Sequence, residues 1–248
     1  MKCVIIRTDF EVKTSSIRVA STQPTYIPWM GFFGLMDCVD RFVLMDDVQF
    51  SRRSWHQRNR VFNPASGWIW LTIPTKGEFP TPMNKVKVDG RSWIRSHLDR
   101  LKALYSAAPY FDDVRLLFDN LRSIESEFLT DYTIGMIQQI RSLLGIETPL
   151  YYSSKISHEF KHKTELLICL TQSVGGGTYV AQPTSVEEYI EKDLFPSSGI
   201  RLELFEYNHP QYRDENFVSH QSILDMISYV PPSNRLAMIR SGVQIKPL

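Results

Sequence analysis

The sequence predicts an α/β protein with a Rossmann-like, mainly parallel sheet. Two observations support this class. Short β-branched and aromatic runs alternate with longer segments in which apolar residues recur at helical spacing. After a purely helical stretch, the last part of the chain again alternates strand-like and helical segments. We therefore expect the chain to return to the same sheet. The expected strands are residues 17–21, 41–47, 68–74, 85–89, 150–153, 178–181 and 201–207.

Helical patterns divide the 248 residues into parts. Trp93, His97 and Leu101 share one helix face, and two similar patterns follow before Gly145. Further helices are expected at 31–39, 164–173, 186–194 and 217–229. The predicted organisation is an N-terminal extension (1–16), an N-terminal α/β part carrying the site (17–90), a helical insertion (91–147) and a C-terminal α/β part completing the sheet (148–248).

Composition narrows the class of protein. The chain is 43% hydrophobic and 22% charged, which is ordinary for a globular enzyme. Its 28 Lys+Arg residues nearly balance its 27 Asp+Glu residues, which argues against a protein whose main task is coating nucleic acid, although a local basic patch remains open. Three scattered cysteines and the lack of an apolar run of about 18 residues predict a cytoplasmic protein without a membrane span.

The first candidate motif, Q-P-T-Y-I-P-W, joins the first strand to a helix. Two prolines stiffen this loop, and loops beyond the carboxyl ends of parallel strands form the ligand crevice of open α/β sheets. We expect Gln23, Tyr26 and Trp29 to bind substrate there, with the two rings stacking on a base or sugar. The alternative is that both aromatic residues pack in the core.

The second candidate motif, D-D-V-Q-F-S-R-R-S-W-H-Q-R-N-R, follows the second strand. Arginine suits phosphate or carboxylate, and histidine titrates near neutral pH. His56 or Asp47 is expected to take the proton from an attacking amine, with Tyr26, Gln49 and His56 facing one crevice. The alternative is a solvated, salt-bridged turn. The residues expected to hold an anionic substrate are Arg52, Arg53, Arg58 and Arg60.

These two motifs, together with W-L-T-I-P, W-x-x-x-H, Y-S-A-A-P-Y-F and S-I-L-D, resemble the WbqC-like family over nearly the whole chain from residue 17. Members of that family occur in bacterial gene clusters for surface polysaccharide and are described as glycine or aminoacyl transferases. The resemblance implies a transferase of surface-polysaccharide (O-antigen-like) precursor biosynthesis that acylates a nucleotide-linked amino sugar. An aminoacyl-tRNA is one donor that it implies.

A more remote likeness concerns nucleotidyltransferases with an H-x-G-H signature. Gly31 opens a helix at similar spacing after the first strand, but Phe32 stands where the second histidine would be. The likeness implies a shared scaffold, with a nucleotidyltransferase or adenylating enzyme as one alternative function. A non-catalytic module that binds RNA or a nucleotide is the other, since arginine and aromatic residues serve phosphate contact and stacking.

No metal and no cofactor are expected, apart from a nucleotide or nucleotide sugar as substrate. The H-E-x-x-H match at 158–162 has lysine beside its supposed ligands, so we predict that it holds no zinc. The glycine run at 175–177 falls between a helix and a strand, which favours a helix end over a phosphate-binding loop.

Overall fold

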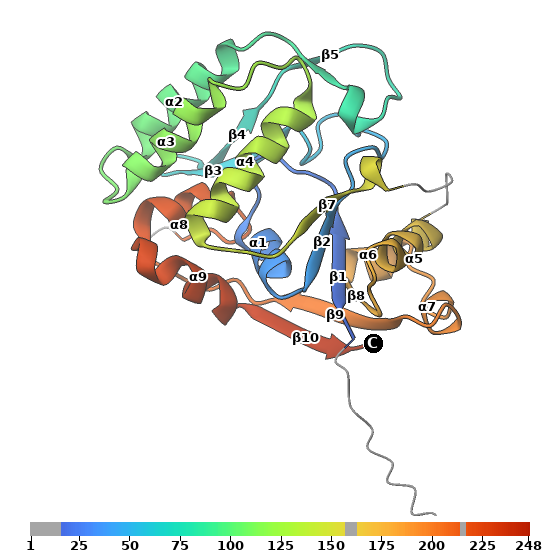
Figure 1. Cartoon of the computed structure of the whole chain (residues 1–248). Helices are drawn as coiled ribbons and strands as arrows, with labels where there is room; N and C mark the ends of the chain where they lie inside the picture. Colours follow the sequence, from blue (N-terminus) through green and yellow to red (C-terminus); the bar gives the residue numbers. More distant parts are fainter. Residues whose placement is uncertain (1–15, 157–162, 214–216) are drawn as a thin grey trace, which may run out of the picture.

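The computed structural model describes residues 16–156, 163–213 and 217–248. Its centre is a six-stranded sheet of strand order β10-β9-β8-β1-β2-β7 (Figure 1). All neighbouring strands are parallel except β10, which runs antiparallel to β9. The predicted class, α/β with a mainly parallel sheet, is confirmed. The strands are β1 Arg18–Thr22, β2 Arg41–Leu44, β7 Leu150–Tyr152, β8 Thr178–Ala181, β9 Arg201–Tyr207 and β10 Val243–Pro247.

Helices cover both faces of this sheet, because alternate residues of each strand point to opposite sides. Val19 and Val43 pack towards α5 (Lys163–Ser173) and α7 (Leu194–Ser197). Ala20 and Phe42 join the larger core that contains α1 (Met30–Asp37) and part of α9 (Pro232–Ser241). Figure 1 shows these two pairs of helices on opposite sides of β1. The near-continuous apolar strands therefore follow from double coverage.

The chain reverses its direction of travel across the sheet beside β1. It passes from β1 to β2 and β7 on one side, then returns to β8 and β9 on the other. Such a reversal separates the loops that follow the two central strands, here β1 and β8, and opens a crevice at their carboxyl ends.

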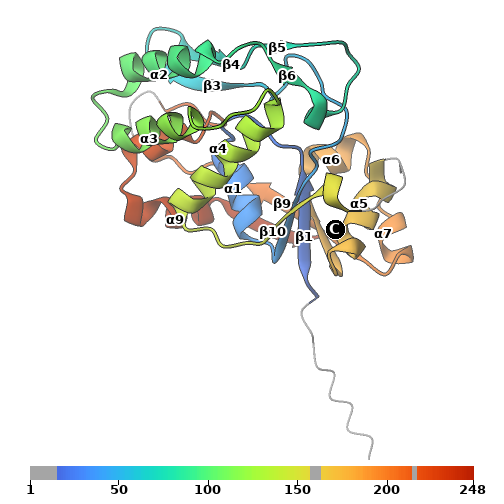
Figure 2. The same ribbon diagram turned by 45° about the horizontal axis from the view of Figure 1, so that its top comes forward.

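A separate layer lies above this carboxyl edge (Figures 1 and 2). We call residues 51–105 the cap. It contains the hairpin β3–β4, the short pair β5–β6, one 3-10 turn and helix α2. The loop expected up to residue 60 is corrected here, because Arg58 already begins β3. The elements are β3 Arg58–Asn63, β4 Gly67–Thr72, β5 Thr75–Lys76, η1 Met83–Lys85, β6 Lys87–Val88 and α2 Ser92–Tyr105.

Helices α3 (Phe111–Leu121) and α4 (Leu129–Leu144) follow α2 within the stretch expected to be helical. Two later expectations were wrong. The single helix expected at 186–194 is replaced by α6 (Pro183–Glu188), a turn and α7. The closing helix is only α8 (Leu224–Tyr229), because residues 217–223 contain turns and no helix. Prolines at 231 and 232 end α8 and start α9, after which β10 returns to the sheet.

Two smaller predictions fall near α5. Gly175 follows this helix with a φ of 72°, so the glycine run ends a helix as predicted. The H-E-x-x-H segment lies outside the described residues, so the absence of zinc there stays a prediction. None of the helices within the described residues is long and apolar enough to cross a bilayer.

Candidate functional site

A cavity of about 540 Å³ lies at the carboxyl ends of β1 and β8, between the sheet and the cap. Three separate segments line it: the loop after β1, the start of the cap, and the loop after β8 with α6, whose last residue, Glu188, adds a carboxylate. His220 adds a fourth wall from the C-terminal part. Small-molecule sites have volumes of about 300 to 1,000 Å³ and favour this place in α/β sheets.

The loop after β1 is fixed by the cap. The side-chain amide of Asn59, on β3, donates to the carbonyl oxygens of Tyr26 and Ile27 at 3.1 and 3.0 Å. Ile27 has a φ of 40°, which a β-branched residue rarely adopts, so the loop depends on these bonds to hold its shape. The N–H of Tyr26 also donates to the carbonyl of Trp55 at 3.0 Å. The cavity wall is therefore rigid before any ligand binds.

Gln23 and His56 form a polar pair at the centre of this wall. The backbone N–H of Ser51 donates to Nδ1 of His56 at 3.3 Å, so the ring proton lies on Nε2 and is donated to Oε1 of Gln23 at 2.5 Å. Burial lowers the pKa of His56 to about 4, which keeps the ring neutral. Because Oε1 of Gln23 accepts this proton, its NH₂ group remains as a donor for a ligand.

Arg60 supplies positive charge to the cavity. Its guanidinium lies 5.4 Å from the ring centre of Trp55 and donates to the carbonyl of His220 at 3.4 Å. Trp55 is 45% exposed, so its indole presents a flat apolar surface beside the charge. A guanidinium next to an aromatic face suits a phosphate-bearing ligand with a planar ring.

Trp29 and His220 form the opposite wall. Their rings stack with centroids 5.1 Å apart, and a Cβ placed on Gly31 would overlap the indole. Burial, followed by the charge of Arg60, lowers the pKa of His220 below its ordinary value, so its imidazole is unprotonated at neutral pH. Its Nδ1 bonds the hydroxyl of Ser219 at 2.9 Å, and Nε2 has no hydrogen-bond partner among the described residues.

His220 was not predicted as a site residue. The chain segment that carries it is tied to the site by two backbone bonds, from Ser222 N–H to the Arg60 carbonyl and from Ile223 N–H to the Pro28 carbonyl, both 2.9 Å. The one sequence signal was its position two residues before the S-I-L-D motif. The spacing of apolar residues did not indicate that His220 would contact Trp29.

The structure places Tyr26 elsewhere than expected. Its side chain is fully buried, its hydroxyl bonds Nδ1 of His97 at 2.8 Å, and its ring meets the edge of Trp93. It therefore does not face the cavity together with His56, because the turn at Ile27 directs the ring into the core. This was the packing alternative. Trp29, by contrast, lines the cavity.

Asp47 and Gln49 also lie outside the cavity lining. The hydroxyl of Ser153, directly after β7, donates to Asp47, and both oxygens of Asp46 accept bonds from Ser154. These carboxylates therefore join the ends of β2 and β7. Gln49 is exposed, and its backbone pairs with Pro82. The crevice expected to unite Gln49 with Tyr26 and His56 is not formed.

The four arginines separate into two groups. Arg60 lines the cavity, whereas Arg58 lies over Trp70, 4.1 Å from the ring centre, on the outer face of the hairpin. Arg52 and Arg53 are exposed, with Arg52 over the ring of Phe79. None of the four forms an ion pair within the part of the chain that the structure describes, so the salt-bridged turn is not observed.

Comparison with known proteins identifies the family. The model of the WbqC-like protein family matches residues 23–236, which include every segment that lines the cavity. The chain belongs to the WbqC-like family. It is 34% identical over 222 residues to the uncharacterized protein Rv1507c of Mycobacterium tuberculosis, an alignment that covers 85% of this chain and 92% of that protein. No solved structure matches this chain.

Proposed function

We propose that this WbqC-like protein is a transferase that binds a nucleotide-linked amino sugar in the cavity and acylates its amino group. The observation that carries the proposal is the pairing of an unprotonated imidazole, His220, with a guanidinium, Arg60, in one cavity. A sugar nucleotide needs a cation for its phosphates, and an attacking amine needs a base. Surface-polysaccharide precursor synthesis, which the family resemblance implies, uses substrates of this kind.

The positions of the residues that line the cavity indicate which part of the substrate each would bind. Arg60 would contact the diphosphate, and the free NH₂ group of Gln23 would donate to a phosphate or sugar oxygen. Trp29 and Trp55 provide flat faces for the base and the sugar ring. His56 acts here as a positioning residue, because both of its ring nitrogens are already bonded and it fixes the direction of the Gln23 amide.

The chemical step uses Nε2 of His220 as a general base. The sugar amine attacks the acyl carbon of an activated ester, so that a new N–C bond forms and the bond to the ester oxygen of the donor breaks. The proton leaves the amine for Nε2 and then passes to the departing oxygen. A glycyl or other aminoacyl group is the expected acyl group. General base catalysis of this kind contributes about 10² to 10⁴ in rate.

Calorimetric titration with diphosphate-linked amino sugars tests the binding step. We expect Arg60→Ala to weaken binding about tenfold, since charge-assisted hydrogen bonds contribute about 1.5 to 3 kcal/mol. The control is Arg122→Ala, an exposed arginine at the end of α3. If no amino-sugar nucleotide binds, or if both variants bind like the unchanged protein, the proposal is wrong.

Mass spectrometry of the sugar nucleotide after incubation with aminoacyl esters tests the transfer step. His220→Gln should keep binding and lose at least about 10²-fold in rate. In the unchanged protein the rate should rise with pH and reach half of its plateau below about pH 6.5, because the pKa of His220 is lowered. Release of pyrophosphate from nucleoside triphosphates, without acylation, would favour the nucleotidyltransferase alternative.

A further inference from the structure

The cap has a large positive net charge, although the net charge of the whole chain is near zero. Residues 51–105 contain eleven Lys and Arg against three Asp and Glu, so their formal charge is +8. The rest of the chain has seventeen basic and twenty-four acidic residues, a charge of −7, and the two parts together give the total of +1. The near-neutral total therefore hides a strongly basic layer at one end of the molecule.

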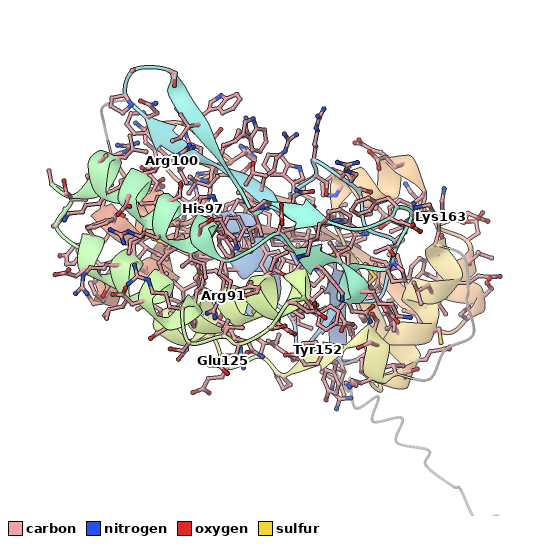
Figure 3. The ribbon with its side chains drawn as sticks, turned by 90° about the horizontal axis from the view of Figure 1, so that it is seen from above. Arg91, His97, Arg100, Glu125, Tyr152 and Lys163 are labelled. Carbon is pink, nitrogen blue, oxygen red and sulfur yellow. The ribbon has the colours of Figure 1, made fainter. Side chains whose placement is uncertain are left out.

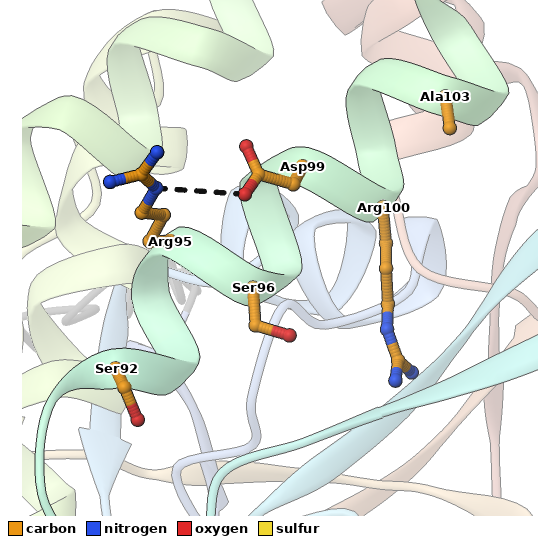
Figure 4. Close-up of a pocket in the computed structure, with 6 residues that line it drawn as sticks. All are labelled: Ser92, Arg95, Ser96, Asp99, Arg100 and Ala103. Atoms are coloured by element: carbon orange, nitrogen blue, oxygen red, sulfur yellow. Dashed lines mark ion pairs between the residues drawn. The ribbon is translucent and has the colours of Figure 1, made fainter.

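Much of this charge is not compensated locally. In Figure 4, Asp99 pairs with Arg95 at 3.7 Å, while Arg100 extends from the other side of α2. Viewed from above, Arg100 lies on the side of α2 next to the hairpin (Figure 3). Within the described residues, no ion pair is formed by Arg52, Arg53, Arg58, Arg60 or Arg100. A face of this kind attracts polyanions at long range.

Three tryptophans and two arginines form a ladder on the outer face of the hairpin. The ring of Trp70 lies 5.4 Å from the rings of both Trp55 and Trp68, measured between centroids. Arg58 stacks on Trp70, and Arg60 lies between Trp55 and Trp68 at 5.4 and 5.5 Å from their centres. This ladder arises because alternate residues of β3 and β4 point outward, with Arg60 directly opposite Trp70.

Exposure distinguishes this ladder from a core. Trp55 and Trp68 are 45% and 37% exposed, and they are the two aromatic side chains among the large hydrophobic residues exposed within the described part of the chain. The ladder also continues into the cavity, because Trp55 and Arg60 belong to both. A ligand that lay along the hairpin would therefore end at the proposed site of reaction.

We infer that the outer face of the cap binds a single-stranded RNA whose end reaches the cavity. Unpaired bases can stack on the exposed rings of Trp55 and Trp68, while the basic side chains around them contact phosphates. A duplex hides its bases and would leave the rings unused. The choice of RNA over DNA rests on the proposed function, because a ribose end carries the hydroxyls on which an aminoacyl ester is held. Binding of a single strand does not rest on it.

Fluorescence anisotropy with a labelled RNA of roughly 12 nucleotides tests the inference. The single strand should bind at about 50 mM salt and lose more than about tenfold in affinity at about 200 mM, as several phosphate contacts require. Trp68→Ala should weaken binding about tenfold, from the loss of one stacked base. The matched control is Leu116→Ala, which removes an exposed apolar side chain from α3.

Several results would overturn the inference. They are absence of binding at low salt, equal affinity for a duplex of the same sequence, and equal effects of Trp68→Ala and Leu116→Ala. DNA that binds as tightly as RNA would refute the choice of RNA. Vesicles containing phosphatidylserine that compete in a Trp68-dependent manner would indicate a membrane surface instead. Titration with sugar nucleotides is a separate experiment. A failure of RNA binding does not contradict the proposed transferase, and a failure of sugar-nucleotide binding does not contradict the single-strand binding surface.

Discussion

The two faces of the β3–β4 hairpin use similar residues for opposite purposes. Beneath the hairpin, Tyr26, Trp93 and His97 form a buried cluster in contact with the strand backbone. On its outer side, tryptophans alternate with Arg58 and Arg60 in contact with solvent. Both clusters combine aromatic rings with nitrogen-bearing groups, so residue type alone does not separate them.

The difference lies in burial and in which polar atoms a ligand can reach. Nδ1 of His97 bonds the Tyr26 hydroxyl, and its other nitrogen bonds the Thr72 backbone, so nothing is left for a ligand. Outside, the guanidinium groups rest on rings and keep hydrogen-bonding capacity. Nε1 of Trp93 has no partner among the described residues, but it is buried out of reach of a ligand. A buried aromatic cluster contributes to stability, whereas a partly exposed one with accessible donors is available for binding.

The largest expected effect separates the two faces by stability. Tyr26→Ala empties a fully buried site and should lower the free energy of unfolding by about 3 to 5 kcal/mol. Trp68→Ala removes an exposed ring and should cost less than about 0.5 kcal/mol. Chemical denaturation measures both. Similar losses in the two variants would show that the outer tryptophans are structural.

The next effect is a loss of stability in acid. Burial lowers the pKa of His97 and of His56 to about 4, against about 6.5 in an unfolded chain. Between these values the unfolded chain binds more protons, so the free energy of unfolding is complete above about pH 6.5 and falls towards pH 4. The loss should be about 2 to 3 kcal/mol per histidine. Chemical denaturation at several pH values in this range measures the loss. The free energy of unfolding should fall less steeply with falling pH in His56→Gln than in the unchanged protein.

A smaller effect tests the cavity wall between the two faces. Gly31→Ala would place a methyl group against the benzo ring of Trp29, so the indole must move away from His220. We expect a cost of about 1 to 2 kcal/mol in stability, typical of an overpacked site, and weaker binding of sugar nucleotides. Gly67→Ala, in the exposed hairpin turn, is the control for backbone strain alone. Unchanged ligand binding in Gly31→Ala would exclude Trp29 from the site.

The smallest effect on stability belongs to Arg58→Ala. Its half-buried cation–π contact with Trp70 contributes about 0.5 to 1 kcal/mol, so the melting temperature should change little. Binding of a phosphate-bearing ligand should still weaken, because a charge of the outer face is lost. Thermal unfolding and anisotropy measured on the same preparation check both. A collapse of stability with unchanged binding would identify Arg58 as structural.

The sequence alone predicted five of the six strands of the central sheet, because these are short apolar runs separated by turns. It missed β10, and the strands expected at 68–74 and 85–89 lie in the cap and not in that sheet. It failed at β3, where Arg58 and Arg60 alternate with Asn59 and Val61. From sequence alone, such a strand resembles a polar loop. Its outward arginines are accommodated in a strand because they pack on tryptophan rings of β4. The second failure, α8, came from reading an apolar pattern through residues 217–223. These residues contain turns and no helix, and backbone bonds from Ser222 and Ile223 tie their end to Arg60 and Pro28.

The site was predicted in part. The loops that follow the first two strands were predicted to lie together, and Gln23, Trp29, His56 and Arg60 do line one cavity. The direction of Tyr26 could not be predicted, because it depends on the positive φ of Ile27 and the distant amide of Asn59. His220 could not be predicted either, since its place depends on tertiary hydrogen bonds across most of the chain.

The reversal of the chain beside β1 also constrains how the protein folds. Ser21 in β1 bonds the hydroxyl of Tyr179 in β8 at 3.0 Å, although the two residues are 158 positions apart. During synthesis, β1 must wait for most of the chain before its second neighbour exists, and closing so long a loop is slow. Residues after β8 and His220 line the cavity, so it cannot be complete before these residues have been made. A complete cavity therefore requires that the N-terminal and C-terminal parts of the protein have packed together.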